Sequence, residues 1–177
     1  MSAPHDSPAP VPADWSIQPL ADADLPALLR LNAANYPSVH TLDESTLDWL
    51  LAFGGGHHLA AVDRAGAVVG YLLSFASTTD YDDSEIAELR RRITEPFFYI
   101  CQVVVAPERR GAGIARAFYA EVAETAKREG VRLLCCDVNT NPPNPGSFAF
   151  HHRLGFTEIG PGTASNGFAI TFLGKPV

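Results

Sequence analysis

A glycine-rich segment with two arginines at its start lies past the middle of the chain. It reads Arg109-Arg110-Gly111-Ala112-Gly113-Ile114-Ala115 and follows the apolar run 97–105. Glycine lets the backbone approach a ligand closely, because it has no Cβ atom. A helix that begins at this loop would point free N–H groups and the positive end of its dipole at the same place. We therefore predict an anion site, best suited to a phosphate or pyrophosphate, with the arginines as additional donors.

The spacing of this loop separates three kinds of phosphate-binding site. A P-loop ends in Gly-Lys-Ser/Thr, whereas Gly113 is followed by Ile114 and Ala115. A dinucleotide-binding fingerprint needs a third glycine where Arg116 stands, and it normally opens the first βαβ unit. The third pattern is Arg/Gln-x-x-Gly-x-Gly/Ala after a strand that ends in Val-x-Pro. Residues 105–115 match it at every position.

A second block of residues lies near the C-terminus and has the spacing Asn-x-x-Ala-x-x-Phe-Tyr-x-x-x-Gly-Phe. The residues at these positions are Asn144, Ser147, Phe150, His151, Gly155 and Phe156. Ser147 replaces the alanine, and His151 replaces the tyrosine. With both blocks in order, the last part of the chain, from the strand before the glycine loop onward, resembles the GNAT (GCN5-related) N-acetyltransferase superfamily.

The resemblance implies acetyl-CoA as the cosubstrate and no metal. It implies that the pantetheine arm pairs with the strand 103–105 and that the pyrophosphate lies on the amides of 111–115. The residues assigned to the cosubstrate in this way are Val103, Val104, Val105, Arg110, Gly111, Ala112, Gly113, Ile114, Ala115, Arg116, Asn144 and Ser147. The implied reaction is direct attack of a primary amine in a ternary complex, without an acyl-enzyme.

His151 and Asp137 are the candidate catalytic residues. The attacking amine must lose a proton, and the leaving thiolate benefits from gaining one. His151 stands where the family's tyrosine often protonates the thiolate, and an imidazole could do this or act as a base. The alternative for His151 is a half-exposed helix histidine without a chemical role. Tyr119, on the helix after the glycine loop, is predicted to pack or to face solvent.

The general base is harder to assign, because the strand before the loop carries no acid. It offers Tyr99, Cys101 and Gln102, with Glu95 only at its entrance. Asp137 lies on the following strand and could face the cleft, or it could serve a structural hydrogen bond. Cys101 as a nucleophile would imply an acyl-enzyme, but buried strand cysteines are usually inert.

Two polar groups in the first half of the chain could select the substrate. One comprises Asn32, Asn35, Tyr36 and His40, at the end of an expected helix. The other comprises Asp80, Asp82, Asp83 and Glu85, which could attract an amine but is more simply interpreted as a solvated helix start. His57 and His58 are adjacent and chelate poorly together, so we interpret them as part of a loop.

The elements that must position these residues alternate between helix and strand. Strands are expected at 16–19, 58–62, 67–77, 97–105, 131–138, 156–159 and 168–173. Helices are expected from 22 or 24 to about 34, from 43 to the glycines at 54, at 84–92, 113–129 and 147–154. This alternation predicts an α/β fold, a mixed sheet of six or seven strands with helices on both faces. The resemblance implies that the sheet splays between its central strands.

Composition limits the class of protein. The 177 residues suggest one domain, 15–177, after a proline-rich tail, 1–14, that is predicted to be disordered. A net charge of −7 argues against binding to nucleic acid or to anionic membranes. The three cysteines form neither a disulfide framework nor a zinc motif, and the N-terminus lacks the features of a signal peptide. A cytoplasmic protein is expected.

We predict an N-acetyltransferase acting on a primary amine, either a small molecule or a peptide. The alternative is a CoA-binding sensor or interaction module without catalysis, since the expected tyrosine is absent. A larger acyl group than acetyl is a third reading. The chain could also pair as a homodimer.

Overall fold

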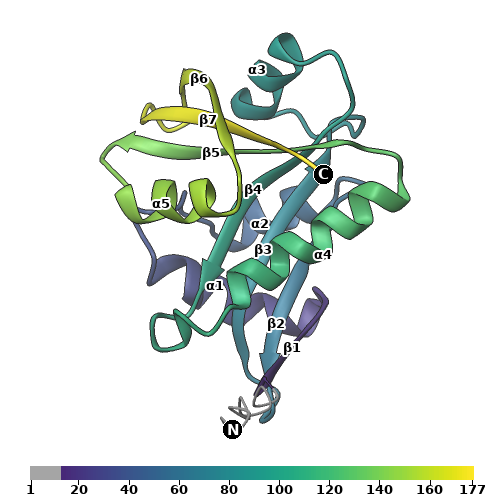
Figure 1. Ribbon diagram of the computed structural model, residues 1–177. Coiled ribbons are helices and arrows are strands. Elements are labelled where there is room, and N and C mark those ends of the chain that lie inside the picture. Colours follow the sequence, from purple (N-terminus) through teal and green to yellow (C-terminus); the bar gives the residue numbers. More distant parts are fainter. Residues whose placement is uncertain (1–12) are drawn as a thin grey trace, which may run out of the picture.

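The computed structural model describes residues 13–177, and its elements follow the predicted order (Figure 1). The strands are β1 Trp15–Pro19, β2 Leu59–Asp63, β3 Val68–Ala76, β4 Phe98–Val105, β5 Leu133–Asn141, β6 Thr157–Thr163 and β7 Ala169–Pro176. The helices are α1 Leu25–Ala33, α2 Glu44–Leu51, α3 Ser84–Arg92, α4 Ile114–Arg128 and α5 Pro145–Arg153, with 3-10 turns at Asp22–Asp24 and Pro107–Arg109. β5 and β6 run farther than predicted, because their pairing with β7 continues past the apolar residues that mark them in the sequence.

The strands form one seven-stranded sheet in the order β1-β2-β3-β4-β5-β7-β6, which confirms the predicted mixed α/β fold. β4 and β5 are parallel neighbours at its centre. They pair only from Phe98 with Leu134 to Ile100 with Cys136, although β4 continues to Val105. The sheet is therefore splayed from Ile100 onward, as expected, and the backbone edges of β4 and β5 face each other without a shared ladder.

Helices cover both faces of the sheet. α4 crosses one face, with α5 beside it over β5, while α1 and α2 lie behind the sheet in Figure 1. On the α4 face, Ile114, Phe118 and Val122 are buried, as their helical spacing predicts. On the opposite face, Leu28 from α1 and Leu47 from α2 enter a second hydrophobic core.

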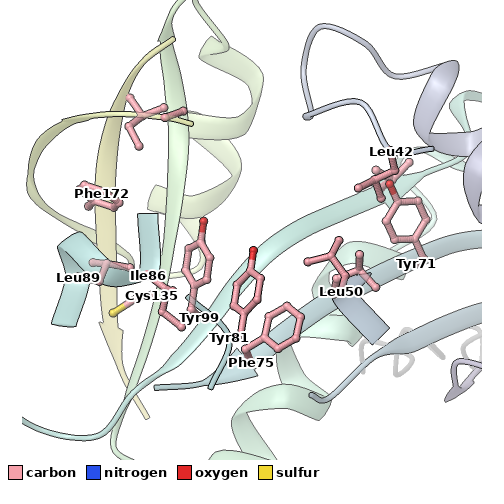
Figure 2. Packing of buried hydrophobic residues seen from close by; sticks show 14 of the residues in the cluster. Leu42, Leu50, Tyr71, Phe75, Tyr81, Ile86, Leu89, Tyr99, Cys135 and Phe172 are labelled. Carbon is pink, nitrogen blue, oxygen red and sulfur yellow. The ribbon is translucent and has the colours of Figure 1, made fainter. Parts of the chain in front are cut away.

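This second core is rich in aromatic rings close to the splay. Phe75 and Tyr81 stack with their ring centroids 3.9 Å apart. Figure 2 shows Tyr81 beside Tyr99, with both hydroxyl groups pointing the same way, out of the apolar cluster. The core thus fixes the rings of both tyrosines and leaves their polar ends for hydrogen bonds.

The predicted N-terminal tail lies almost wholly outside the described residues. Asp14, which we assigned to that tail, accepts a backbone hydrogen bond from Arg64 N at 3.1 Å and pairs with Arg109. None of the helices between residues 13 and 177 has the length and apolar character that crossing a membrane would require.

Candidate active site

A cleft of about 910 Å³ lies where β4 and β5 separate. Residues 101–105 of β4 and 137–139 of β5 line its two sides. Arg110 follows the C-terminal end of β4, whereas Tyr81 stacks on Phe75, whose strand partner Tyr99 lies near the start of β4. All of these except Phe75 line the cleft together with Glu85. The splay therefore creates a continuous space between the predicted anion loop and the predicted acidic group, which are far apart in the sequence.

The glycine loop has the conformation that its sequence predicts. Gly111 and Gly113 have φ of 81° and 85°, values that residues with a Cβ rarely adopt. A Cβ added at either position would meet nothing within 4 Å, so these glycines are needed for backbone conformation rather than for packing. Gly113 is the N-cap of α4, and no side chain caps that helix. These free N-terminal donors suit the phosphate groups of acetyl-CoA.

The predicted cosubstrate residues divide into two sets. Those that line the cleft are Val103, Val104, Val105, Arg110, Ala115, Asn144 and Ser147. The others are Gly111, Ala112, Gly113, Ile114 and Arg116. Ile114 is 1% exposed and its side chain belongs to the core, so only its backbone could serve a ligand, while the side chain of Arg116 points to solvent.

Two of the cleft residues already have partners within the chain. The Arg110 guanidinium donates to Asn35 Oδ1 at 2.7 Å. Asn144 caps α5 by accepting a hydrogen bond from Ser147 N at 3.2 Å. A phosphate at the loop would compete with Asn35 for Arg110, whereas the role of Asn144 as a cap fixes where α5 begins.

His151 is only 3% exposed, so the interpretation of it as a half-exposed helix residue is wrong. It is buried because α5 packs against α4, where Tyr119 OH lies 2.6 Å from His151 Nε2. The other ring nitrogen, Nδ1, lies 2.8 Å from the carbonyl oxygen of Ser147. Burial lowers the pKa of His151. Tyr119 packs, as predicted, but it also lines the cleft.

Asp137 lines the cleft at the point where β5 leaves β4. Its Oδ1 accepts a hydrogen bond from Tyr99 OH at 2.6 Å. Burial raises the pKa of Asp137 to about 7, against the opposing effect of the Tyr99 hydrogen bond. A carboxyl group with this pKa exchanges protons readily near neutral pH. Burial also raises the pKa of the nearby Cys101 thiol, which disfavours the thiolate that a nucleophile needs.

The simpler interpretation of the acidic group at the start of α3, a solvated helix start, is wrong for part of the group. Glu85 is 2% exposed because the turn between β6 and β7 packs over it, and its Oε1 accepts from Ser165 N at 3.0 Å. Asp83 caps α3 through Ile86 N at 2.8 Å, and burial raises its pKa. Asp80 and Asp82 are exposed, as expected.

A buried hydrogen-bond network holds the loop 34–43 beside the cleft. The sequence analysis did not predict that Asn32 would hold this loop in place. Asn32 is fully buried and donates to His40 O at 2.8 Å and to Tyr71 OH at 3.0 Å. Leu42 N donates to Asn32 Oδ1 at 2.8 Å, and Gln102 Nε2 donates to His40 O at 3.0 Å. The one signal in the sequence was a polar residue on the apolar face of a short helix.

His57 and His58 lie in a loop, as interpreted from the sequence. Within residues 13–177, no three histidine, cysteine, aspartate or glutamate side chains gather closely enough to hold a metal ion.

The splayed mixed sheet, with an anion loop at one end of the splay and ionisable groups beside it, defines a class of CoA-dependent acyltransferase folds. The sequence model of the acetyltransferase (GNAT) family matches residues 25–156. The chain therefore belongs to the GNAT acetyltransferase family, as its motifs predicted. No curated protein sequence matches it significantly.

Solved structures of acetyltransferases share the fold. Arabidopsis thaliana NAA60 in complex with acetyl-CoA has a TM-score of 0.72 at 19% identity, covering 92% of this chain and 99% of that chain. A Sinorhizobium meliloti phosphinothricin acetyltransferase with acetyl-CoA has a TM-score of 0.68 at 21% identity, covering 93% and 89%. The Brucella melitensis ribosomal-protein-alanine N-acetyltransferase has a TM-score of 0.64 at 27% identity, covering 92% and 99%. Acetyl-CoA in two of these structures agrees with the predicted cosubstrate.

Proposed function

We propose that this protein is an N-acetyltransferase that transfers the acetyl group of acetyl-CoA to a primary amine by direct attack in a ternary complex. The observation that carries the proposal is that one cleft is lined by Arg110 and Ala115, which flank the glycines of the anion loop, and by Asp137, whose pKa is about 7. Membership of the GNAT family supports the same activity.

The loop end of the cleft has the donors that the cosubstrate requires. Acetyl-CoA, when bound, supplies the activated acyl group. The backbone of 103–105 borders the splay, so its unpaired groups can hydrogen-bond the amides of an extended arm. The N-terminal amides of α4 and the Arg110 guanidinium can hold its phosphates, once Arg110 exchanges Asn35 for the ligand.

Asp137 is the group that we assign as general base. A primary amine is mostly protonated at neutral pH and has no lone pair in that form. The ionised Asp137 can take the proton. Tyr99 donates a hydrogen bond to one carboxylate oxygen, which leaves the other oxygen to accept the proton of the amine. His151, on α5, lies beside Tyr119 and lines the same cleft, and we assign it to the same proton-transfer machinery.

The acceptor end of the cleft suits a cationic substrate. Asp83 and Glu85 supply carboxyl groups, and the indole of Trp49, which is 47% exposed, supplies an aromatic face nearby. We assign the acceptor as a small-molecule amine or a peptide amine. The Brucella melitensis relative, named for acetylating a ribosomal-protein alanine, makes a peptide N-terminus one amine to test. A cytoplasmic location fits the three cysteines, all free.

The second candidate function is a CoA-binding protein without catalysis. The observation in its favour is that His151, in place of the family's tyrosine, has both ring nitrogens engaged within the chain. Such a protein would bind acetyl-CoA through the same glycine loop. The two functions differ in whether an amine releases the thiol.

The test is thiol release from acetyl-CoA against a panel of primary amines, including peptides with free N-termini. Gly113→Trp fills the loop and should abolish turnover. Gly130→Trp is the matched control, because Gly130 also has a positive φ, 72°, but lies at the far end of α4. Tight binding of acetyl-CoA by the parent, with no amine raising thiol release above background, would favour the CoA-binding function instead.

A further inference from the structure

The hydroxyl of Tyr119 and the ring of His151 form a buried pair at the cleft. They come from different helices, α4 and α5, and meet at 2.6 Å between Tyr119 OH and His151 Nε2. Both side chains line the cleft, and both are less than 5% exposed. Two titratable groups that are buried, that contact each other and that border a cleft are suited to transferring a proton.

The surroundings of His151 determine which nitrogen carries its proton. Nδ1 lies 2.8 Å from the carbonyl oxygen of Ser147, which can only accept, and 3.2 Å from the Ser147 hydroxyl, which can accept as well as donate. Nδ1 therefore carries the hydrogen of the neutral ring. Nε2 is left as an acceptor, and it takes the hydrogen bond that Tyr119 donates. His151 in this state has no proton to give to the cleft, and its free nitrogen is covered by the Tyr119 oxygen.

The Tyr119 oxygen is thus the polar atom through which His151 reaches the cleft. It donates its one hydrogen to Nε2, and its lone pairs remain for a donor, with the Cys136 thiol, which also lines the cleft, as its other neighbour. We propose that Tyr119 is a catalytic residue for the acetyl transfer proposed above, and that His151 is a positioning residue that takes and returns a proton through it. This assignment rests on the proposed function.

The proton balance of the step closes without another reactant. As the new carbon–nitrogen bond forms, Tyr119 accepts a proton from the attacking nitrogen while its own proton passes to His151 Nε2. As the carbon–sulfur bond breaks, Tyr119 gives its proton to the departing sulfur and recovers one from Nε2. Both residues end in their starting states, and one proton has moved from nitrogen to sulfur. Asp137 then serves the earlier step, in which it takes the proton of the ammonium form of the substrate and releases it to water.

The experiment compares kcat and KM in the intact protein and in the variants Tyr119→Phe, His151→Gln and the double variant. Each single variant should lower kcat at least about 100-fold and leave the KM for acetyl-CoA within about threefold. The double variant should be no slower than the slower single variant, because the two residues act as one unit. Glutamine can accept the hydrogen bond of Tyr119 but cannot take up its proton. His151→Gln should therefore keep the geometry and still lose the rate.

Phe118→Leu is the matched control. Phe118 precedes Tyr119 on α4, is fully buried in the core and does not line the cleft. Its loss should cost stability but leave kcat close to that of the parent. Circular dichroism melting of every variant confirms that each one folds before its rate is interpreted.

Three results would overturn the assignment. Tyr119→Phe could keep kcat within about threefold of the parent, His151→Gln could retain full kcat, or the losses could multiply in the double variant. If the parent acetylates amines and any one of these three results is found, only the assignment of Tyr119 is contradicted. A parent that releases no thiol with any amine contradicts the proposed function as well.

Discussion

Burial acts on Asp137 and His58 in opposite directions, because it disfavours the charged form of each. It raises the pKa of Asp137 to about 7 and lowers that of His58 to about 4. Asp137 has Tyr99 as a partner and opens to the cleft. Neither ring nitrogen of His58 has a partner within residues 13–177. The same physical effect thus brings the pKa of one residue close to neutral pH and leaves the other residue as a cost to stability.

Asp137→Asn should lower kcat at least about 100-fold, since an amide cannot accept the amine proton. In the parent, kcat/KM should rise with pH through about 7, as the carboxyl group ionises. The folded-state pKa lies above that of an unfolded aspartate, so stability falls as pH rises from about 4 to 7. The variant should therefore be equal to the parent near pH 4 and more stable than it at pH 8, by up to about 4 kcal/mol.

Steady-state rates and urea unfolding at the two pH values measure both effects. Asp80→Asn is the control, because Asp80 is exposed and outside the cleft. Parental rates in Asp137→Asn would remove Asp137 from the mechanism, and an acid limb in that variant at the same pH would assign the titration to another group.

His58→Leu should flatten the acid side of the stability curve. The pKa of His58 in the folded protein lies below the unfolded value of 6.5. The free energy of unfolding of the parent is therefore at its full value above pH 6.5 and decreases as pH falls toward 4. The variant should be more stable than the parent at pH 4.5 by roughly 1–2 kcal/mol, with a smaller difference at pH 8. Urea unfolding across this pH range measures the effect, with His152→Leu at an exposed position as the control. The prediction is contradicted if the free energy of unfolding of both variants depends on pH as steeply as that of the parent.

At the scale of elements, the position of each site residue depends on how neighbouring segments meet. The loop 34–43 has little regular structure of its own and is held by Asn32 on α1 and Gln102 on β4. Glu85 on α3 is buried by the turn that carries Ser165. The end of the cleft that we propose for the amine is therefore assembled from segments that are joined by buried polar contacts rather than by a sheet ladder.

Asn32→Ala should lower the free energy of unfolding by about 2–3 kcal/mol, because it leaves buried partners without hydrogen bonds. It should also raise the KM for the amine, because the loop 34–43 loses its anchor, with a smaller effect on the KM for acetyl-CoA. Asn35→Ala is a partly exposed control from the same helix end and should cost less than about 1 kcal/mol. An Asn32→Ala variant as stable as the parent would show that the network contributes little.

The local parts of the fold and site could be predicted from sequence. The glycine loop is read from residues next to one another, and Gly111 and Gly113 have the positive φ that such a loop needs. The helix 84–92 follows from a charge pattern within one segment and has the predicted bounds. The buried state of Glu85 and the contact of Tyr119 with His151 depend on packing between segments distant in sequence. No periodicity encodes such contacts.

At the scale of the whole molecule, the two halves of the sheet meet through a short ladder. β4 and β5 share three residue pairs, and the cleft occupies the rest of their length. A ligand in the cleft would contact both halves of the sheet, which come together only in the folded chain. Its binding therefore adds directly to the free energy of unfolding.

Acetyl-CoA should raise the melting temperature of the parent. At a concentration 100 times its Kd it adds about 2.7 kcal/mol, which corresponds to roughly 5–10 °C for a domain of this size. Gly113→Trp should lose this shift, and Gly130→Trp should keep it even though both variants melt lower than the parent without ligand. Differential scanning fluorimetry measures all three, and equal shifts in both variants would place the ligand away from the loop.

Acetyl transfer is tested most sharply by the mass of the amine after reaction with acetyl-CoA. We expect the parent to form one N-acetylated amine for each thiol released, and Gly113→Trp to form neither. Thiol release without an acetylated amine would identify a hydrolase rather than a transferase. Product formation that Gly113→Trp leaves unchanged would contradict the assignment of the cosubstrate to the glycine loop and to the cleft between β4 and β5.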